Sequence, residues 1–346
     1  MGLIVARVTQ KKISEELNVS VMTVSKALRG VAGISEATRE RVLAVAKRYK
    51  YVPNLLARDL LRQRSRAIGF VFSDLTYGYA QRIIEGAKSV LHDEEYRTLI
   101  GLTSWSRKEE NSEIDLMLGC QVEGMICQPT FGGEATFQRI VDYGIPLVFV
   151  ADCLNISSAS WVGLDGKDAS LKIMEHLFEL GHRRIAFVAP RSVEKSVSLL
   201  PRLSGYKDFL VSHDVEVDQE LIGLSRLGSV SDICGLTNKL MSLSHPPTAI
   251  LGISDSIAFQ VMDCLMKRGC RVPEDVSVAG MGGLLSSSYE MISLTTVEED
   301  AHQIGVIAAK IILKQLADKN AVSVKKLLKG PLIVRRSTGR ISSNGK

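Results

Sequence analysis

The chain has 346 residues, 45% of them hydrophobic and 23% charged, which indicates two or three globular units. No stretch approaches 18 uncharged apolar residues, and the first ten residues lack the apolar run of a secretory signal. These features argue against a membrane-spanning or secreted protein, and we expect a cytoplasmic one. Residues 1–66 carry a net charge of +9, from 14 basic and 5 acidic residues, whereas the remainder carries −4. Such asymmetry is typical of a protein that contacts a polyanion with one end.

The basic segment begins with two short predicted helices. Thr9 can cap a helix over residues 10–17, and Ser20 can cap a second helix over residues 21–28. Val24 then lies on the inward-facing side of the second helix. Two short helices joined by a three-residue turn are the helix-turn-helix arrangement.

A third helix is predicted after Ser35, so that residues 1–50 form a small all-helical domain. In such a domain the second helix enters the DNA major groove and presents its N-terminal residues to base edges. Val21 and Met22 stand at that position, and neither can make a hydrogen bond through its side chain. We therefore expect them to read bases by apolar contact, with thymine methyl groups as partners.

Residues 51–65, YVPNLLARDLLRQRS, predict a hinge helix. Pro53 disfavours helix immediately before it, and Asn54 can cap a helix that follows. An isolated helix of about eight residues is unstable in water, so we expect this one to fold only when it is paired or bound to DNA. The alternative is an ordinary linker that contains a few leucines.

Residues 66–340 alternate short apolar runs with amphipathic helices. This alternation predicts doubly wound α/β structure, and the length fits two lobes. Each apolar run is short enough to be a buried parallel strand. The predicted strands are AIGFVF (67–72), GMICQ (124–128), PLVFV (146–150), RIAFVA (184–189), TAILGI (248–253) and VSVAGM (276–281).

Eight motifs follow one another along the chain. The first three are VSVMTVSKALRG, ISEATRERV and YVPNLLARDLL, and the later ones are GLDGKDASLKIMEHLFELGHRRIAFV, RLSGYKDFL, PTAILGISDSIAFQVM, GCRVPEDVSVAGMGG and LTTV. In this order they resemble the lactose/galactose repressor family of bacterial transcription regulators. The resemblance covers nearly the whole chain.

The resemblance implies a multi-domain protein with a small all-α helix-turn-helix head and an α/β core of two doubly wound lobes, similar to periplasmic sugar-binding proteins. The N-lobe is expected over about 66–163 and 294–318, and the C-lobe over about 164–293 and 319–340. It also implies a repressor of carbohydrate-uptake or catabolism genes that binds a palindromic operator in double-stranded DNA as a homodimer. A small sugar or sugar derivative between the lobes would control it, without a cofactor and without membrane contact.

The resemblance assigns DNA contacts to the head and the hinge. Val21 and Met22 match the two main specificity positions, and Leu60 matches a leucine that each subunit inserts between base pairs from the minor groove. The expected DNA-binding residues are Thr9, Ser20, Val21, Met22, Thr23, Ser25, Lys26, Asn54, Ala57 and Leu60.

Effector contacts are expected beyond the carboxyl ends of the parallel strands, where open α/β sheets bind ligands. Arg202 and Asp255 match the family's arginine and aspartate that hydrogen-bond effector hydroxyls or carboxylates. Glycines at 282 and 283 replace the family's usual carboxylate, so the effector is expected to differ in one hydroxyl contact. The expected effector-binding residues are Ser73, Tyr77, Tyr79, Gln128, Asp152, Asp165, Arg202, Asp255 and Gly283. The alternative is that these are surface residues of loops.

Two other classes of protein fit the sequence less well. An enzyme is the first, but the chain has no G-x-x-x-x-G-K-[ST] phosphate loop and no G-x-S-x-G elbow, so no catalytic residue is predicted. The six cysteines form no C-x-x-C pair and have no zinc spacing, so no metal site is predicted and all six are expected to be reduced. A periplasmic sugar receptor, the second, would need a signal peptide and would not carry a basic helix-turn-helix.

Overall fold

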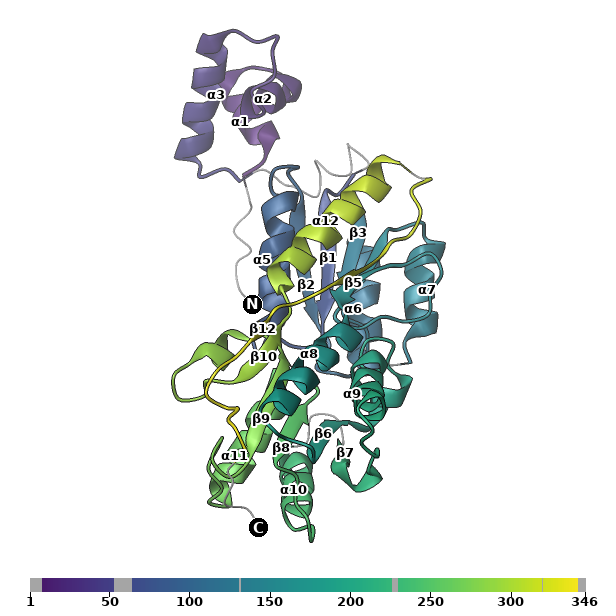
Figure 1. Cartoon of the computed structure of the whole chain (residues 1–346). Helices are drawn as coiled ribbons and strands as arrows, with labels where there is room; N and C mark the ends of the chain where they lie inside the picture. The colour runs from purple at the N-terminus through teal and green to yellow at the C-terminus, as the bar shows by residue number, and fades with distance from the viewer. Residues whose placement is uncertain (1–7, 53–63, 131, 226–229, 319, 342–346) are drawn as a thin grey trace. The chain divides into compact units, whose positions relative to one another are not determined.

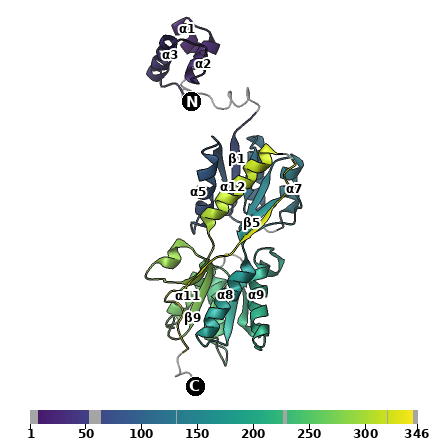
Figure 2. The same ribbon diagram turned by 45° about the horizontal axis from the view of Figure 1, so that its top comes forward.

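The computed structural model describes residues 8–52, 64–130, 132–225, 230–318 and 320–341. The chain divides into two compact units, residues 1–64 and 65–346, which are called the head and the core below. The described part of the head is helical, and the core contains two separate six-stranded sheets (Figures 1 and 2). The expected fold class, a helix-turn-helix head with a two-lobed α/β core, is confirmed.

Each described helix of the head begins at its predicted cap. The side-chain oxygens of Thr9, Ser20 and Ser35 accept hydrogen bonds from backbone N–H groups three residues on, at 3.4, 3.0 and 3.3 Å. The three apolar stripes meet in one small core, made of Ile13, Val24, Ala27, Val42, Val45 and Ala46. The helices are α1 (Gln10–Leu17), α2 (Val21–Leu28) and α3 (Glu36–Arg48).

The N-lobe of the core is built on the first sheet, whose strand order is β11-β5-β4-β3-β1-β2 and whose pairings are all parallel. Helices α5 and α12 cover one face, and α6 and α7 cover the other. Strand β1 is buried along its whole length because both faces are covered, which explains its unbroken apolar sequence. The strands are β1 (Ala67–Phe72), β2 (Arg97–Leu102), β3 (Gly124–Cys127), β4 (Leu147–Val150), β5 (Ser160–Leu164) and β11 (Lys325–Leu328). The helices are α5 (Tyr79–Leu91), α6 (Arg107–Gly119), α7 (Glu134–Asp142) and α12 (Ala301–Ala317).

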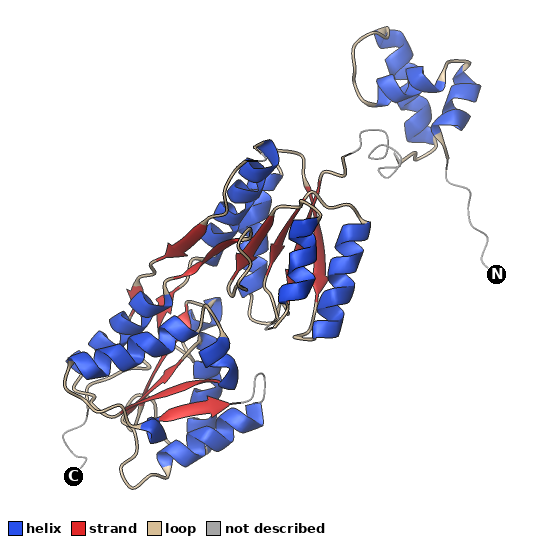
Figure 3. Cartoon of the chain, turned by 90° about the vertical axis from the view of Figure 1, so that its right-hand side faces the viewer, coloured by secondary structure: helices blue, strands red, loops and turns tan. Residues whose placement is uncertain are grey.

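The C-lobe is built on the second sheet, whose order is β12-β10-β9-β8-β6-β7, with only the β10–β12 pairing antiparallel among the described strands. Helices α8 and α9 cover one face and α10 and α11 the other, so both lobes have helices on both sides of a sheet (Figure 3). The strands are β6 (Ile185–Pro190), β7 (Ile222–Ser225), β8 (Ala249–Gly252), β9 (Ser277–Gly282), β10 (Thr295–Glu298) and β12 (Leu332–Ile333). The helices are α8 (Gly166–Glu179), α9 (Leu200–Ser212), α10 (Val230–Met241) and α11 (Asp255–Lys267), with short 3₁₀ helices η1 (Arg191–Lys195), η2 (Gln219–Leu221) and η3 (Leu285–Ser288).

Two glycines set the distance between α5 and α12, which lie side by side (Figure 1). A Cβ atom on Gly86 would lie 1.9 Å from the carbonyl oxygen of His302, and one on Gly305 would lie 2.0 Å from that of Ile83. No side chain fits at either place, so the two backbones touch. This close packing fixes the start of α5 relative to the chain segment that leads into α12.

Two expected lobe boundaries are wrong. The chain crosses between the lobes after β5, after β10 and after β11, because β10 pairs with β9 in the second sheet and β11 pairs with β5 in the first. The boundary expected at 294 therefore lies after 298, and the one expected at 319 lies after 328. Strand β11 was missed because its sequence, KKLL, is largely exposed at a sheet edge and carries no apolar pattern.

The cysteines follow the expectation only in part. Cys234 on α10 and Cys264 on α11 form a disulfide with a Cα–Cα distance of 5.3 Å, so the expectation that all six are reduced is wrong for this pair. Thirty residues separate the two in sequence, and only the packing of α10 on α11 brings them together. Cys127 and Cys153 are buried thiols, and burial raises the pKa of Cys153 to about 12.

Candidate DNA-binding and effector sites

The start of α2 presents two apolar side chains to solvent. Val21 and Met22 are 45% and 68% exposed, whereas Val24 is fully buried in the head. The Ser20 Oγ atom lies 2.9 Å from the Thr23 Oγ1 atom, so both hydroxyls take part in the cap. The apolar pair is thus exposed at the N-terminus of α2, the position from which a recognition helix contacts base edges, and its contact with DNA stays a prediction.

The other predicted DNA contacts are partly accounted for by local structure. Thr9 caps α1 with its hydroxyl oxygen, and Ser25 and Lys26 are half-buried on α2. Their roles on DNA stay predictions. The three predicted hinge contacts, Asn54, Ala57 and Leu60, lie outside the described residues.

A buried ion pair lies where the strands of the two lobes end, and a tyrosine connects it to the N-lobe. Arg202, on α9 of the C-lobe, donates from Nη1 to the carbonyl oxygen of Ile253 at 2.9 Å, and its Nη2 atom lies 3.4 Å from the Glu299 Oε2 atom. Glu299 follows β10, and its Oε1 atom accepts a hydrogen bond from the Tyr79 hydroxyl, at the start of α5, at 2.7 Å. Burial and the Glu299 charge raise the pKa of Tyr79 well above its ordinary value, so this phenol stays protonated and donates.

A second contact between the lobes involves Asp152. This residue follows β4 of the N-lobe, and its Oδ2 atom accepts from the Ser196 hydroxyl at 2.9 Å, while Oδ1 accepts from the Ser198 backbone N–H at 3.3 Å. Both serines lie between η1 and α9 of the C-lobe. The ends of β1 and β4 in one sheet therefore meet residues that follow β6, β8 and β10 in the other, as the position of an interlobe site requires.

Asp255 lies next to this region but is buried. It has no exposed surface, and its Oδ2 atom accepts from the Leu284 N–H at 2.8 Å and from the Ser287 hydroxyl at 2.6 Å, while Oδ1 accepts from the Thr296 hydroxyl at 2.6 Å. Burial raises its pKa above the ordinary 3.8. In this conformation Asp255 ties the loop after β9 to β10, and its contact with an effector stays a prediction.

Two further predicted effector residues, Asp165 and Gly283, have roles in the local fold of the chain. Asp165 caps α8 by accepting from the Asp168 N–H at 3.1 Å. Gly283 has a φ of +63°, and a Cβ atom there would lie 2.7 Å from the Cα atom of Glu298, so glycine is needed for the fold of this turn.

The remaining predicted residues, Ser73, Tyr77 and Gln128, follow β1 and β3. Ser73 is buried, and its hydroxyl has no hydrogen-bond partner among the described residues, whereas Tyr77 is exposed and Gln128 is half-buried. Sequence reasoning missed Trp105, an exposed side chain that follows β2 and donates from Nε1 to the Asp74 carboxylate at 2.9 Å. The signal was a tryptophan three residues after the segment RTLIGL (97–102), which was not recognised as a strand.

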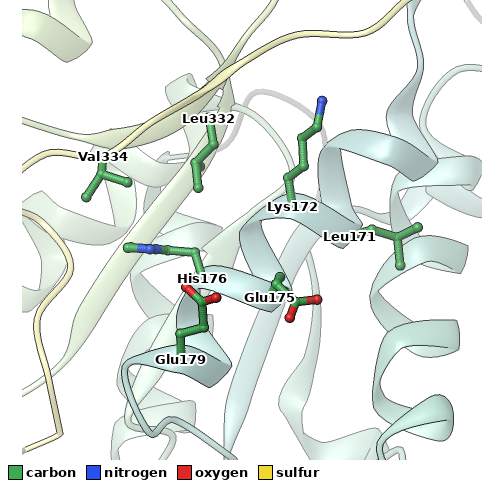
Figure 4. A pocket seen from close by; sticks show the side chains of 7 residues that line it. All are labelled: Leu171, Lys172, Glu175, His176, Glu179, Leu332 and Val334. Atoms are coloured by element: carbon green, nitrogen blue, oxygen red, sulfur yellow. The ribbon is translucent and has the colours of Figure 1, made fainter.

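A separate open groove of about 510 Å³ lies on the C-lobe between α8 and the segment around β12 (Figure 4). None of the predicted effector residues lines it, and it is not at the strand ends where the lobes meet. Its lining residues are Leu171, Lys172, Glu175, His176, Glu179, Leu332 and Val334. We regard the interlobe contacts as the stronger candidate because they join both lobes through buried charges.

No group of three or more His, Cys, Asp or Glu residues is placed to bind a metal ion within the described ranges. Over those same ranges, none of the helices has the length and apolar character that crossing a membrane demands.

Comparison with known proteins agrees with this division into head and core. Residues 9–54 match the family described as bacterial regulatory proteins, lacI family, and residues 174–338 match the periplasmic binding protein-like domain. The HTH-type transcriptional repressor CytR of Escherichia coli strain K12 is 28% identical over 333 residues, which cover 95% of this chain and 96% of CytR. The probable HTH-type transcriptional repressor ExuR of Bacillus subtilis strain 168 is 26% identical over 341 residues, which cover 97% of this chain and all of ExuR.

Solved structures agree as well. The lac repressor dimer bound to operator and the anti-inducer ONPF is 26% identical, with a TM-score of 0.83 over 96% of this chain and 99% of the repressor chain. Head and core are thus matched together and in the same order, in sequence and in structure. The chain thus carries a lacI-family helix-turn-helix domain and a periplasmic binding protein-like domain, and over nearly its whole length it is similar to DNA-binding transcription regulators that share this combination.

Proposed function

We propose that the protein represses genes of carbohydrate uptake or catabolism by binding a palindromic operator as a homodimer, and that a small sugar-like effector between the lobes controls this binding. The observation that carries the proposal is the exposed pair Val21 and Met22 at the capped start of α2, on a segment with net charge +9. A basic surface supplies affinity for phosphates, and the side chains at the start of the helix supply sequence preference.

Exposed apolar side chains support the homodimer. Leu285, Tyr289 and Met291 lie on or just after η3, and Met291 is 98% exposed. Apolar residues gathered on one exposed segment mark interaction surfaces, and a second copy of the chain suits a two-fold symmetric operator. We assign this segment to the dimer interface.

The contacts between the lobes support control by an effector. Tyr79 and Asp152 of the N-lobe bond to Glu299, Ser196 and Ser198, so a ligand that replaces these bonds changes the relation between the lobes. A ligand controls DNA binding only through its different affinities for two such arrangements. Coupling of this kind amounts to about 1–3 kcal/mol in typical allosteric proteins.

The proposal includes no enzymatic activity. The residues at the strand ends serve hydrogen bonds between the lobes or helix caps, and the relatives described above are transcription regulators. A repressor acts where the chromosome is, so we place the protein in the cytoplasm.

Selection of bound duplexes from a random library, followed by fluorescence anisotropy, tests this function. We expect a palindromic sequence bound at least 1,000-fold more tightly than a scrambled duplex of the same length, with affinity falling steeply between 50 and 200 mM salt. Met22→Ala should reduce the preference for the selected sequence, whereas Leu43→Ala, an exposed change on α3, should leave it intact. Equal affinity for both duplexes would contradict the proposal.

A further inference from the structure

Arg202, the residue expected to bind the effector, is already paired with the carboxylate of Glu299. Arg202 and Glu299 are both more than 90% buried, and their side chains form the ion pair at 3.4 Å. Burying either charge alone is costly, so the pair is stable only together. Tyr79 adds a second hydrogen bond to the same carboxylate and holds it in place. The site therefore presents a neutral pair where the family resemblance predicted a positively charged arginine.

The buried charges at the meeting strand ends, apart from Arg202, are acidic. Asp152 and Asp165 are half-buried and Asp255 is buried, each at the carboxyl end of a strand. The basic residues nearby, Arg191 and Lys195 of η1 and Lys329 after β11, are exposed and screened by water, and Lys329 is paired with Asp168 at 3.1 Å. The field at this edge disfavours a second negative charge.

One donor at the ion pair has no partner. The Nε–H group of Arg202 is buried and has no hydrogen-bond acceptor among the described residues. Buried polar groups are almost always satisfied, so this atom points to a missing acceptor. A ligand hydroxyl suits the place, because its oxygen can accept from Nε–H while its hydrogen is donated to the Glu299 carboxylate.

We propose that Glu299 determines effector specificity, by making the interlobe site accept uncharged, hydroxyl-rich ligands and reject sugar acids and sugar phosphates. The inference rests on the proposed function, since it concerns the same effector site. A carboxylate or phosphate could reach Arg202 only beside the buried Glu299 charge, whereas a diol bridges the two groups without adding charge.

Glu299→Gln tests the inference because it removes the charge and keeps an oxygen for the Tyr79 hydroxyl. The full-length variant is titrated with inorganic phosphate and with D-glucuronate at constant ionic strength, and the thermal shift of the core is measured. We expect both anions to bind at least tenfold more tightly than to the wild type. Glu298→Gln, the exposed neighbouring residue, is the matched control and should behave as wild type. Adding Arg202→Ala to Glu299→Gln should abolish the gain.

A panel of neutral sugars, sugar acids and sugar phosphates on the wild type gives a second readout that needs no folded variant. We expect the stabilising compounds to be neutral. Stabilisation of the wild type by a sugar acid or phosphate above every neutral sugar would overturn the proposal, and so would equal anion binding by Glu299→Gln and Glu298→Gln. Operator binding by the wild type is measured on the same preparation. If the wild type binds operator but the anions bind as in either contradicting outcome, only the role of Glu299 in specificity is refuted. If the wild type does not bind operator, the proposed function is refuted.

Discussion

Replacing Asp255 separates a structural role from a ligand-binding role. The sequence predicted that this carboxylate contacts the effector, but the structure buries it completely beneath the loop that follows β9. Asp255→Ala removes the acceptor for three hydrogen bonds at once, while Ser287 and Thr296 remain fully buried. The change should therefore destabilise the core whether or not effector is present.

The size of the effect follows from the two donors left without an acceptor, the Leu284 N–H and the Ser287 hydroxyl, because the Thr296 hydroxyl also lies 3.3 Å from the Val297 carbonyl oxygen. A buried donor without an acceptor costs about 1–3 kcal/mol, which gives a loss of about 2–6 kcal/mol for two of them. Relief of the buried negative charge offsets part of this loss, since burial already raises the pKa of Asp255. We expect a net loss of about 3 kcal/mol, which for a unit of this size lowers Tm by roughly 5 °C.

Calorimetry of the full-length protein measures the effect, with Asp263→Ala as the matched control. Asp263 lies on the same helix, α11, where its exposed carboxylate pairs with Lys267 at 2.6 Å, so its removal should cost less than about 0.5 kcal/mol. A Tm for Asp255→Ala within 2 °C of the Asp263→Ala value would refute the structural role. Loss of effector response at unchanged Tm would restore Asp255 to the binding site.

Three other outcomes are expected. Replacing the thymines of the selected operator by uracil should weaken wild-type binding several-fold if Val21 and Met22 contact methyl groups; unchanged affinity would exclude methyl recognition. Met291→Glu should shift the dimer toward monomer in sedimentation experiments, whereas Val322→Glu, also highly exposed, should not, and two identical profiles would remove η3 from the interface. Burial lowers the pKa of His182 below the ordinary 6.5, so its neutral form stabilises the fold and stability should fall as pH drops below about 6.5, by at most about 1.4 kcal/mol per pH unit. His182→Gln should flatten that slope, and an unchanged slope would assign the acid sensitivity to other groups.

Much of the head could be predicted because its signals are local. Caps at Thr9, Ser20 and Ser35 determine where the helices begin, and the apolar spacing determines which face is buried. Most inner strands were also predictable, because strands covered on two faces are continuous apolar runs; those predicted are β1, β3 and β4 of the first sheet and β6, β8 and β9 of the second. Edge strands such as β2 and β11 were not predicted, because they are partly exposed and their sequences mix polar and apolar residues.

The effector site could be predicted in its position and less well in its chemistry. Strand ends indicated Tyr79, Asp152 and Arg202, and the structure brings these residues to contacts between the lobes. The neutralisation of Arg202 by Glu299 could not be predicted, because 97 residues separate the two in sequence and only the tertiary fold brings them together. The burial of Asp255 was hidden for the same reason, since its partners lie 29 to 41 residues further along the chain.

The central claim is that ligand binding between the lobes controls operator binding by the head. The direct test is the operator Kd of the full-length protein with and without a compound that stabilises the core, measured for the wild type and for Arg202→Ala. We predict a change in Kd of at least fivefold for the wild type and none for the variant, which should still bind operator. A compound that binds the wild-type core through Arg202 and leaves the operator Kd unchanged would contradict the claim.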